Sequence, residues 1–320
     1  MKKSAIALLA MVQSFAAISG VLIDDGIIAK KDAFPSVVKI STFDYEYRLE
    51  YSESLCTGTL IAPDLVLTAA HCVNLDKNKR QRVSLAGDQQ GLTERFAWGL
   101  LPGGGVKVKQ VFMHNDWLES SKQAKEYRDR LNMVIAAGEM KSFTIEEQQN
   151  IQVNAYLLAK QASSQDFAIL QLESAQKVDA KKLPAVGCKK SLKAGQDIML
   201  VGYGIKSMAD DTKDSNPNNV LNYGYNKLTD SPLISFVYEF AKEKGKQLVN
   251  SGDSGGPLFK KDNQSMIYGV VSTKATDEKD INVASTYGNL SSKDAKDFFK
   301  SLSTNKKAPQ SLKDIASNCL

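Results

Sequence analysis

Gly252-Asp253-Ser254-Gly255-Gly256-Pro257 is the most informative run of this sequence, and a second distinctive run, Thr68-Ala69-Ala70-His71-Cys72, lies far upstream of it. A serine hydroxyl is a weak nucleophile at neutral pH, and a neighbouring imidazole usually takes its proton as attack begins. The chain has only two histidines, His71 and His114. We therefore expect His71 to act as the general base for Ser254.

A third group should orient the imidazole, and a carboxylate fits that role. Asp166 stands at the start of a β-rich apolar segment that ends at Leu172. The order along the chain is then His71, Asp166, Ser254. The simpler interpretation makes Ser254 a turn residue and His71 a packed core side chain. Three motifs in one order favour the catalytic interpretation.

That order separates three hydrolase architectures. Residues 252–256 also satisfy the G-x-S-x-G pattern of α/β-hydrolases, but those enzymes need a histidine after the serine, and none follows Ser254. The subtilisin order would need an aspartate in a recognisable motif before His71, and the sequence has none there. The chymotrypsin order remains.

Several motifs carry a resemblance to a known family. The block Cys56–Cys72 resembles the family's histidine block throughout, and the other matching segments are Val108–His114, Val201–Gly204, Gly252–Pro257 and Gly269–Ser272. The chain is identified on these residues as similar to the chymotrypsin/trypsin family of serine endopeptidases, over most of residues 23–302. The resemblance implies an all-β fold of two antiparallel six-stranded β-barrels with a C-terminal helix. It also implies that the first barrel supplies His71 and Asp166, and the second Ser254.

The resemblance further implies an oxyanion hole and an activation switch. The backbone N–H groups of Gly252 and Ser254 would form the hole, where donors stabilise the developing charge. In the family, a newly freed N-terminal isoleucine inserts beside the aspartate that precedes the nucleophile. Ile23 and Asp253 are our candidates for this pair, although Asp24 stands where a small aliphatic residue is usual. Asp253 as a simple turn carboxylate is the alternative.

Specificity is inferred from the place that corresponds to the primary substrate pocket. The pocket residues by resemblance are Leu248, Val249, Ser272 and Lys274. Leu248 stands where a trypsin has an aspartate, and an unpaired cation in an apolar pocket is costly. We therefore expect an apolar or small P1 residue. Substitutions at Asn250, Thr273 and Lys274 leave open a reshaped or blocked pocket, and hence a catalytically inactive protease-fold binding module.

Four cysteines allow three disulfide connectivities. Cys56 and Cys72 bracket the histidine strand, and the family has a bridge at this spacing. Cys188 and Cys319 remain, and the simplest completion joins them; two unpaired buried thiols are the alternative. The cysteines and histidines show no metal-ligand spacing, so we expect no metal and no cofactor.

The first residues predict export. Lys2 and Lys3 precede an apolar run and a zone of small residues, which is typical of a signal peptide over residues 1–19. A membrane anchor would need about 20 apolar residues, and Gln13 and Ser14 interrupt a shorter run. Residues 20–22 would be a very short propeptide. The mature protein would be secreted or periplasmic, and its net charge is too small to argue for nucleic-acid or membrane partners.

Periodicity indicates the remaining organisation. Six β-rich segments are separated by Gly, Pro, Asn and Asp: 37–40, 65–68, 106–112, 167–172, 198–201 and 267–272. A helical insertion is expected at about 118–164, with Ser120–Gln123 as a capping box and Thr144–Glu147 as the start of a second helix. It would overhang the cleft and narrow the choice of substrate, bind a partner, or simply elaborate the surface.

The end of the chain predicts two further elements. Ser291–Asp294 should cap a helix with Ala295, Phe298, Phe299 and Leu302 on one face. Residues 303–320 form a C-terminal extension with a short helix that ends near Cys319.

Overall fold

The fold is taken from a computed structural model of the chain. The structure describes residues 26–30, 32–46, 49–73, 80–85, 105–204, 220–228, 236–240, 247–276 and 282–320. The expected signal peptide, the short propeptide and Ile23 lie outside the described residues.

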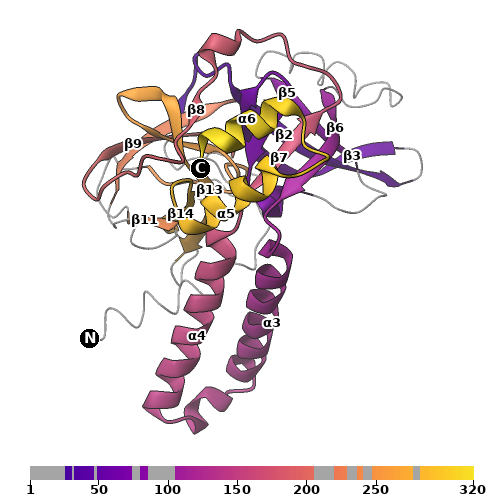
Figure 1. Ribbon diagram of the computed structural model, residues 1–320. Helices are drawn as coiled ribbons and strands as arrows, with labels where there is room; N and C mark the ends of the chain where they lie inside the picture. The colour runs from indigo at the N-terminus through magenta and orange to yellow at the C-terminus, as the bar shows by residue number, and fades with distance from the viewer. Residues whose placement is uncertain are drawn as a thin grey trace.

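The first half of the chain forms a closed six-stranded barrel (Figure 1). Its strands, in the order in which they pair, are β2 (Val37–Glu46), β3 (Leu49–Ala62), β4 (Leu65–Thr68), β7 (Ala168–Leu172), β6 (Val106–Met113) and β5 (Arg80–Leu85). All four residues of β4 are buried, as expected for a short β-branched and leucine-rich run in a barrel. Four of the predicted β segments fall on β2, β4, β6 and β7.

The second half forms an eight-stranded sheet. Its strands, in order of pairing, are β1 (Ile27–Ile28), β10 (Asn222–Lys227), β9 (Asp197–Gly202), β12 (Pro257–Lys260), β13 (Asn263–Thr276), β14 (Asn282–Asn289) and β11 (Phe236–Phe240). The eighth strand, β8 (Ala185–Val186), pairs in parallel with Met266 and Ile267 of β13. The pairing of β14 with β13 begins only at Gly269, so this edge of β13 is available to β8.

The predicted fold class, two antiparallel β units followed by a C-terminal helix, is therefore confirmed. The second unit differs in detail from the expected six-stranded barrel: among the described residues its strands form a sheet with two ends, and the two-residue strands β1 and β8 extend it to eight. Such short segments carry too few residues for an alternating pattern to reveal them in sequence.

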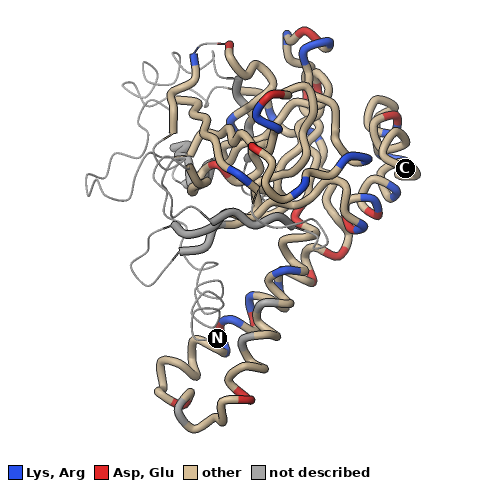
Figure 2. The backbone as a smooth tube through the Cα atoms, turned by 90° about the vertical axis from the view of Figure 1, so that its left-hand side faces the viewer, with Lys and Arg blue, Asp and Glu red and all other residues tan. Residues whose placement is uncertain are grey.

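Two long helices lie side by side and project from the β body as an arm (Figure 1). They are α3 (Trp117–Ala136) and α4 (Ile145–Ser164), and the 3-10 helix η3 (Glu139–Ser142) lies at the tip. We call residues 117–164 the helical hairpin. Figure 2 shows the same projection from a second direction, with charges of both signs along it. Leu131 and Ala155 form its small apolar core, with Tyr127, Met140 and Ile151 packed around them.

The two helix starts predicted for the hairpin have opposite outcomes. At α4 a capping box is formed: the Thr144 hydroxyl accepts from the Glu147 N–H, and the Glu147 carboxylate accepts from the Thr144 N–H. At α3 the prediction is wrong, because the N-cap is Asp116, four residues before Ser120, and the helix begins at Trp117. Ser120 is therefore inside the helix, and its hydroxyl has a tertiary partner described below.

Two C-terminal helices cover one side of the β body (Figure 1). In α5 (Lys293–Ser303) the Ser292 hydroxyl caps the first turn by accepting from the Ala295 N–H at 3.1 Å. The four residues predicted to share its inner face are buried. The last helix, α6 (Gln310–Asn318), contacts α5 and precedes Cys319, which is bonded to Cys188.

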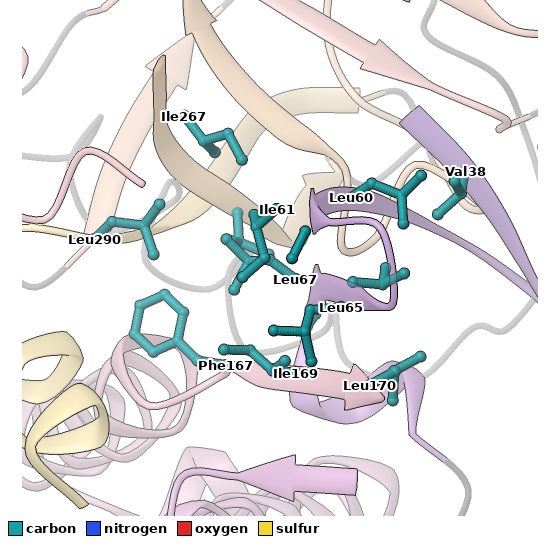
Figure 3. Close-up of a cluster of buried hydrophobic side chains, with 14 of the residues drawn as sticks. Val38, Leu60, Ile61, Leu65, Leu67, Phe167, Ile169, Leu170, Ile267 and Leu290 are labelled. Atoms are coloured by element: carbon teal, nitrogen blue, oxygen red, sulfur yellow. The ribbon is translucent and has the colours of Figure 1, made fainter. Parts of the chain in front are cut away.

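One apolar core connects the barrel, the second sheet and α5 (Figure 3). Leu60, Leu65 and Leu67 of the barrel are at most 1% exposed. Phe167 and Leu290 belong to the same cluster and are fully buried. The strands next to the candidate site are therefore held by a well-packed apolar core. In the described part of the chain, no helix is both long enough and apolar enough to cross a membrane.

Candidate active site

The pairing of β4 with β7 brings His71 and Asp166 together. The two strands are antiparallel, and Thr68 at the end of β4 pairs with Ala168 at the start of β7. His71 lies shortly after the end of β4, in the 3-10 helix η1 (Ala70–Cys72), and Asp166 lies shortly before the start of β7. Residues that lie just beyond paired strand ends must be close in space. The register of one strand pair thus sets the distance between the two side chains.

The Asp166 carboxylate contacts His71 twice. Its Oδ2 lies 2.7 Å from Nδ1 of the imidazole, and its Oδ1 accepts from the backbone N–H of His71 at 2.9 Å. Asp166 is 3% exposed, whereas the His71 side chain is 36% exposed. The imidazole is thus anchored at its buried edge and open to solvent elsewhere.

Burial by itself would lower the pKa of the His71 imidazole. The charge of Asp166 and its hydrogen bond act in the opposite direction and hold that pKa above its ordinary value. The pair is therefore arranged to stabilise a protonated imidazole.

Ser272 supplies a third contact to Asp166. Its hydroxyl donates to Oδ2 at 2.6 Å, and the residue is 2% exposed. On β13, Val271 pairs with Tyr287 and Thr273 pairs with Thr286, so Ser272 is the extra residue of a β-bulge. Bulges re-aim a side chain in this way. We expected Ser272 to line the substrate pocket, and sequence reasoning missed its contact with Asp166.

Ser254 lies in the turn that leads into β12, next to the histidine loop. Its carbonyl accepts from the Thr57 N–H at 2.8 Å, and the sulfur of Cys72, bonded to Cys56, lies 3.5 Å from the same oxygen. The structure thus brings the backbone of Ser254 against the residue that follows His71. It does so although 182 residues separate Cys72 from Ser254.

Gly252, the other expected oxyanion-hole residue, has φ 94°, which a residue with a side chain rarely adopts. Within the described part of the chain, the N–H groups of Gly252 and Ser254 have no protein acceptor. Two backbone donors in this turn are therefore available to a ligand.

Thr57 joins the two β units behind this turn. Its hydroxyl donates to the Gly252 carbonyl at 2.7 Å and accepts from the Tyr203 N–H at 3.0 Å. Its own carbonyl accepts from the Thr68 hydroxyl at 2.9 Å. The residue is fully buried. Sequence reasoning missed Thr57, because only its place between Cys56 and the histidine strand distinguishes it from any other strand threonine.

Asp253 is 1% exposed. Its Oδ1 accepts from the Gly204 N–H at 2.9 Å, and its Oδ2 accepts from the Asn250 N–H at 2.8 Å. A Cβ built on Gly202 would lie 2.1 Å from Oδ1, so the carboxylate sits directly against that backbone. The expected partner of Asp253, Ile23, lies outside the described residues.

The expected pocket residues Leu248 and Val249 are each 2% exposed. The N–H of Val249 donates to the hydroxyl of Ser285 at 3.0 Å, and Ser285 is fully buried. Lys274 belongs to β13, but its side chain lies outside the described residues. Val249 belongs to a buried apolar cluster of the second sheet.

Among the described residues, Cys56, His71 and Cys72 form the one group with the spacing of a metal site. Both sulfurs belong to the Cys56–Cys72 disulfide, so neither is available as a thiolate ligand. The other histidine, His114, is buried and stacks on Phe298 of α5. Burial lowers the pKa of His114 despite nearby aspartates, which fits a neutral packed side chain.

Comparison with known proteins identifies the family of this chain. A family model described as Trypsin matches residues 35–124 and 124–293, well over half of the chain. Among solved structures, the chain is similar to neuropsin, a serine protease expressed in the limbic system of mouse brain, at 17% identity and a TM-score of 0.49. That match covers 84% of this chain and 95% of the neuropsin chain. No curated protein gives a significant sequence match. The chain belongs to the trypsin family.

Proposed function

We propose that this chain is an exported serine endopeptidase that hydrolyses peptide bonds through an acyl-enzyme on Ser254. The observation that carries the proposal is the 2.7 Å contact between His71 Nδ1 and Asp166 Oδ2. A carboxylate on Nδ1 fixes the tautomer in which Nδ1 bears the proton and Nε2 is a free base. That tautomer is the one that general-base catalysis by His71 requires.

The reaction follows from these roles. His71 Nε2 takes the proton of the Ser254 hydroxyl while Oγ attacks the substrate carbonyl carbon. The imidazolium then donates that proton to the leaving amine as the C–N bond breaks, and an ester on Ser254 remains. Water attacks the ester with His71 again acting as base, which releases the acid and restores the hydroxyl.

The negative charge that develops on the carbonyl oxygen needs donors. The N–H groups of Gly252 and Ser254, which have no acceptor in the described structure, support their assignment to this role. Loss of one such donor typically costs about 2.7–4 kcal/mol of transition-state stabilisation. A substituent on Gly252 would disturb the φ that holds them.

We propose an apolar or small P1 residue for the substrate. The buried Leu248 and Val249 support this preference, because neither offers a charge to a P1 lysine or arginine. Protein or peptide substrates follow from the proposed reaction. The helical hairpin as a wall that narrows the choice of substrate, and as a binding site for a partner, stays a prediction.

Export and activation complete the proposal. Two disulfides favour an oxidising compartment, which agrees with a signal peptide over residues 1–19 and a secreted or periplasmic location. The burial of Asp253 supports its proposed role as the partner of a free Ile23 ammonium. A buried carboxylate gains most from a cationic partner in a region that water does not reach.

The proposal can be tested by the intact mass of the secreted protein, with and without a fluorophosphonate probe. We expect one adduct, absent in Ser254→Ala, on a chain that begins at Ile23. No adduct on a chain that begins at Ile23 would reject the peptidase and favour a catalytically inactive protease-fold binding module. No adduct on a longer chain would indicate an unprocessed zymogen, and a repeat after limited proteolysis would then decide between the two.

A further inference from the structure

The helical hairpin ends directly at Asp166. Helix α4 runs to Ser164, and its last carbonyls accept from the two residues that follow it. The Gln165 N–H donates to the Ala162 carbonyl at 3.3 Å, and the Asp166 N–H donates to the Ser163 carbonyl at 3.4 Å. The backbone of Asp166 is therefore part of the C-terminal cap of a 20-residue helix. A shift of the end of α4 would move the Asp166 carboxylate with it.

A buried hydrogen bond joins the two ends of the hairpin at this point. The Ser120 hydroxyl in the first turn of α3 donates to Oε1 of Gln165 at 2.6 Å. Ser120 is 5% exposed and Gln165 is 6% exposed. A polar side chain is buried at a cost unless its partner is present, so both groups are held in one arrangement. The acceptor residue immediately precedes Asp166.

The side chains of the two helices near this bond are small. The buried residues about one turn away on each helix are small, Ala124 on α3 and Ala162 on α4, whereas the larger apolar side chains of the hairpin gather nearer its tip. Alanine contacts tolerate sliding and rotation, because they interlock little. The hydrogen bond fixes a distance and an angle that the small side chains leave open.

We propose that the Ser120–Gln165 hydrogen bond is a positioning contact that holds the Asp166 carboxylate on Nδ1 of His71. The inference rests on the proposed function of Asp166. Ser120 touches neither substrate nor His71; it acts through the end of α4. The hairpin is in this way coupled to the catalytic centre, and a misplacement of about 1 Å at such a centre can reduce the rate about 100-fold.

The test measures the pKa of His71 directly, in a variant that lacks the nucleophile, so the result does not depend on enzymatic activity. In Ser254→Ala protein, the imidazole of His71 is titrated by NMR; it is the one of the two histidines whose signals change in Asp166→Asn. We expect Ser120→Ala to lower the pKa of His71 toward its value in Asp166→Asn. Ser120→Thr keeps the hydroxyl and should restore the pKa. Ser142→Ala, which removes an exposed serine hydroxyl bonded to the Glu139 carbonyl at the hairpin tip, is the matched control and should change nothing.

In protein with Ser254 intact, we expect Ser120→Ala to reduce kcat by about 10- to 100-fold with little change in KM. An unchanged His71 titration and an unchanged kcat would overturn the positioning role. If wild-type protein never reacts with fluorophosphonate, the proposed function fails, and the His71 titration still tests the inference separately.

Folding needs its own variant. Gln165→Met removes the acceptor with a side chain of similar length, and should shift the pKa of His71 in the same direction as Ser120→Ala. If both variants lose the folded circular-dichroism spectrum, the bond is needed for folding, and the positioning role is rejected.

Discussion

The barrel that carries His71 and the helical hairpin that leads to Asp166 bury their side chains to very different extents. Leu65, Val66 and Leu67 of β4 are at most 1% exposed. On the hairpin, Met133 is 72% exposed and Ile145 is 75% exposed. Two helices packed on one face can bury only a narrow stripe, whereas a closed barrel buries every inward side chain.

The difference shows how this chain divides its stability. The barrel is held by a shared apolar core that reaches into the second sheet and α5. The hairpin relies more on local helix devices, such as the Thr144 capping box and the exposed pair Lys125–Asp129. Local devices contribute about 0.3–2 kcal/mol each, and core side chains more. We therefore expect equal substitutions to have unequal effects in the two regions.

The largest expected difference is in kcat, between two carboxylate-to-amide variants: Asp166→Asn beside His71 and Asp129→Asn on the hairpin. Asp166→Asn should reduce kcat by about 10⁴-fold, because the amide can no longer hold His71 in the required tautomer. Asp129→Asn, on an exposed hairpin carboxylate beside Lys125, should leave kcat unchanged. Steady-state rates on a peptide substrate measure both. A decrease of less than tenfold in Asp166→Asn would remove the distinction between the regions.

Core truncations compare the two regions in stability. Leu67→Ala should lower the free energy of unfolding by about 4 kcal/mol, and Leu131→Ala by about 2 kcal/mol. The barrel cannot close around the cavity, whereas the unbranched Met140 beside Leu131 can partly fill it. Urea unfolding gives both values. Equal losses would mean that the hairpin core is as constrained as the barrel.

The pH dependence of activity should follow the protonation of His71 in the barrel. His71 must be neutral to take the serine proton, and its pKa lies above the ordinary value near 6.5. The kcat/KM should therefore be full above the pKa of His71, and should decrease about tenfold per pH unit below it. A pH–rate profile with its acid limb below pH 6 would contradict the raised pKa.

The smallest effect is expected at the hairpin cap. Thr144→Ala should cost about 1 kcal/mol, because it removes the side chain that accepts from the Glu147 N–H. Helix content by circular dichroism should decrease while kcat stays the same. The Thr144 hydrogen bonds lower the pKa of Glu147, so the stability that this carboxylate contributes is present above its unfolded pKa near 4.5 and is lost as pH falls through the folded value. At pH 3 or below, the difference in stability between Thr144→Ala and the wild type should therefore become smaller.

The starts of α3 and α4 show where sequence reasoning about the fold succeeds and where it fails. Thr144 and Glu147 satisfy each other within one helical turn, so the pattern contains both partners. Ser120 has the same local pattern, but its hydroxyl bonds to Gln165, 45 residues away. The sequence pattern is identical in kind, and only the approach of α4 to α3 separates the two outcomes.

The amino-acid sequence alone was sufficient for the family and for the strands β4 and β7, which end and begin beside His71 and Asp166. These features are encoded in motifs of a few consecutive residues and in short periodic patterns. Tertiary structure alone decided the partners of Ser272, Thr57 and Ser120. Their hydroxyls bond across 106, 195 and 45 residues, respectively. A hydroxyl can serve many partners, and its choice depends on which backbone or side chain the packed fold brings within about 3 Å.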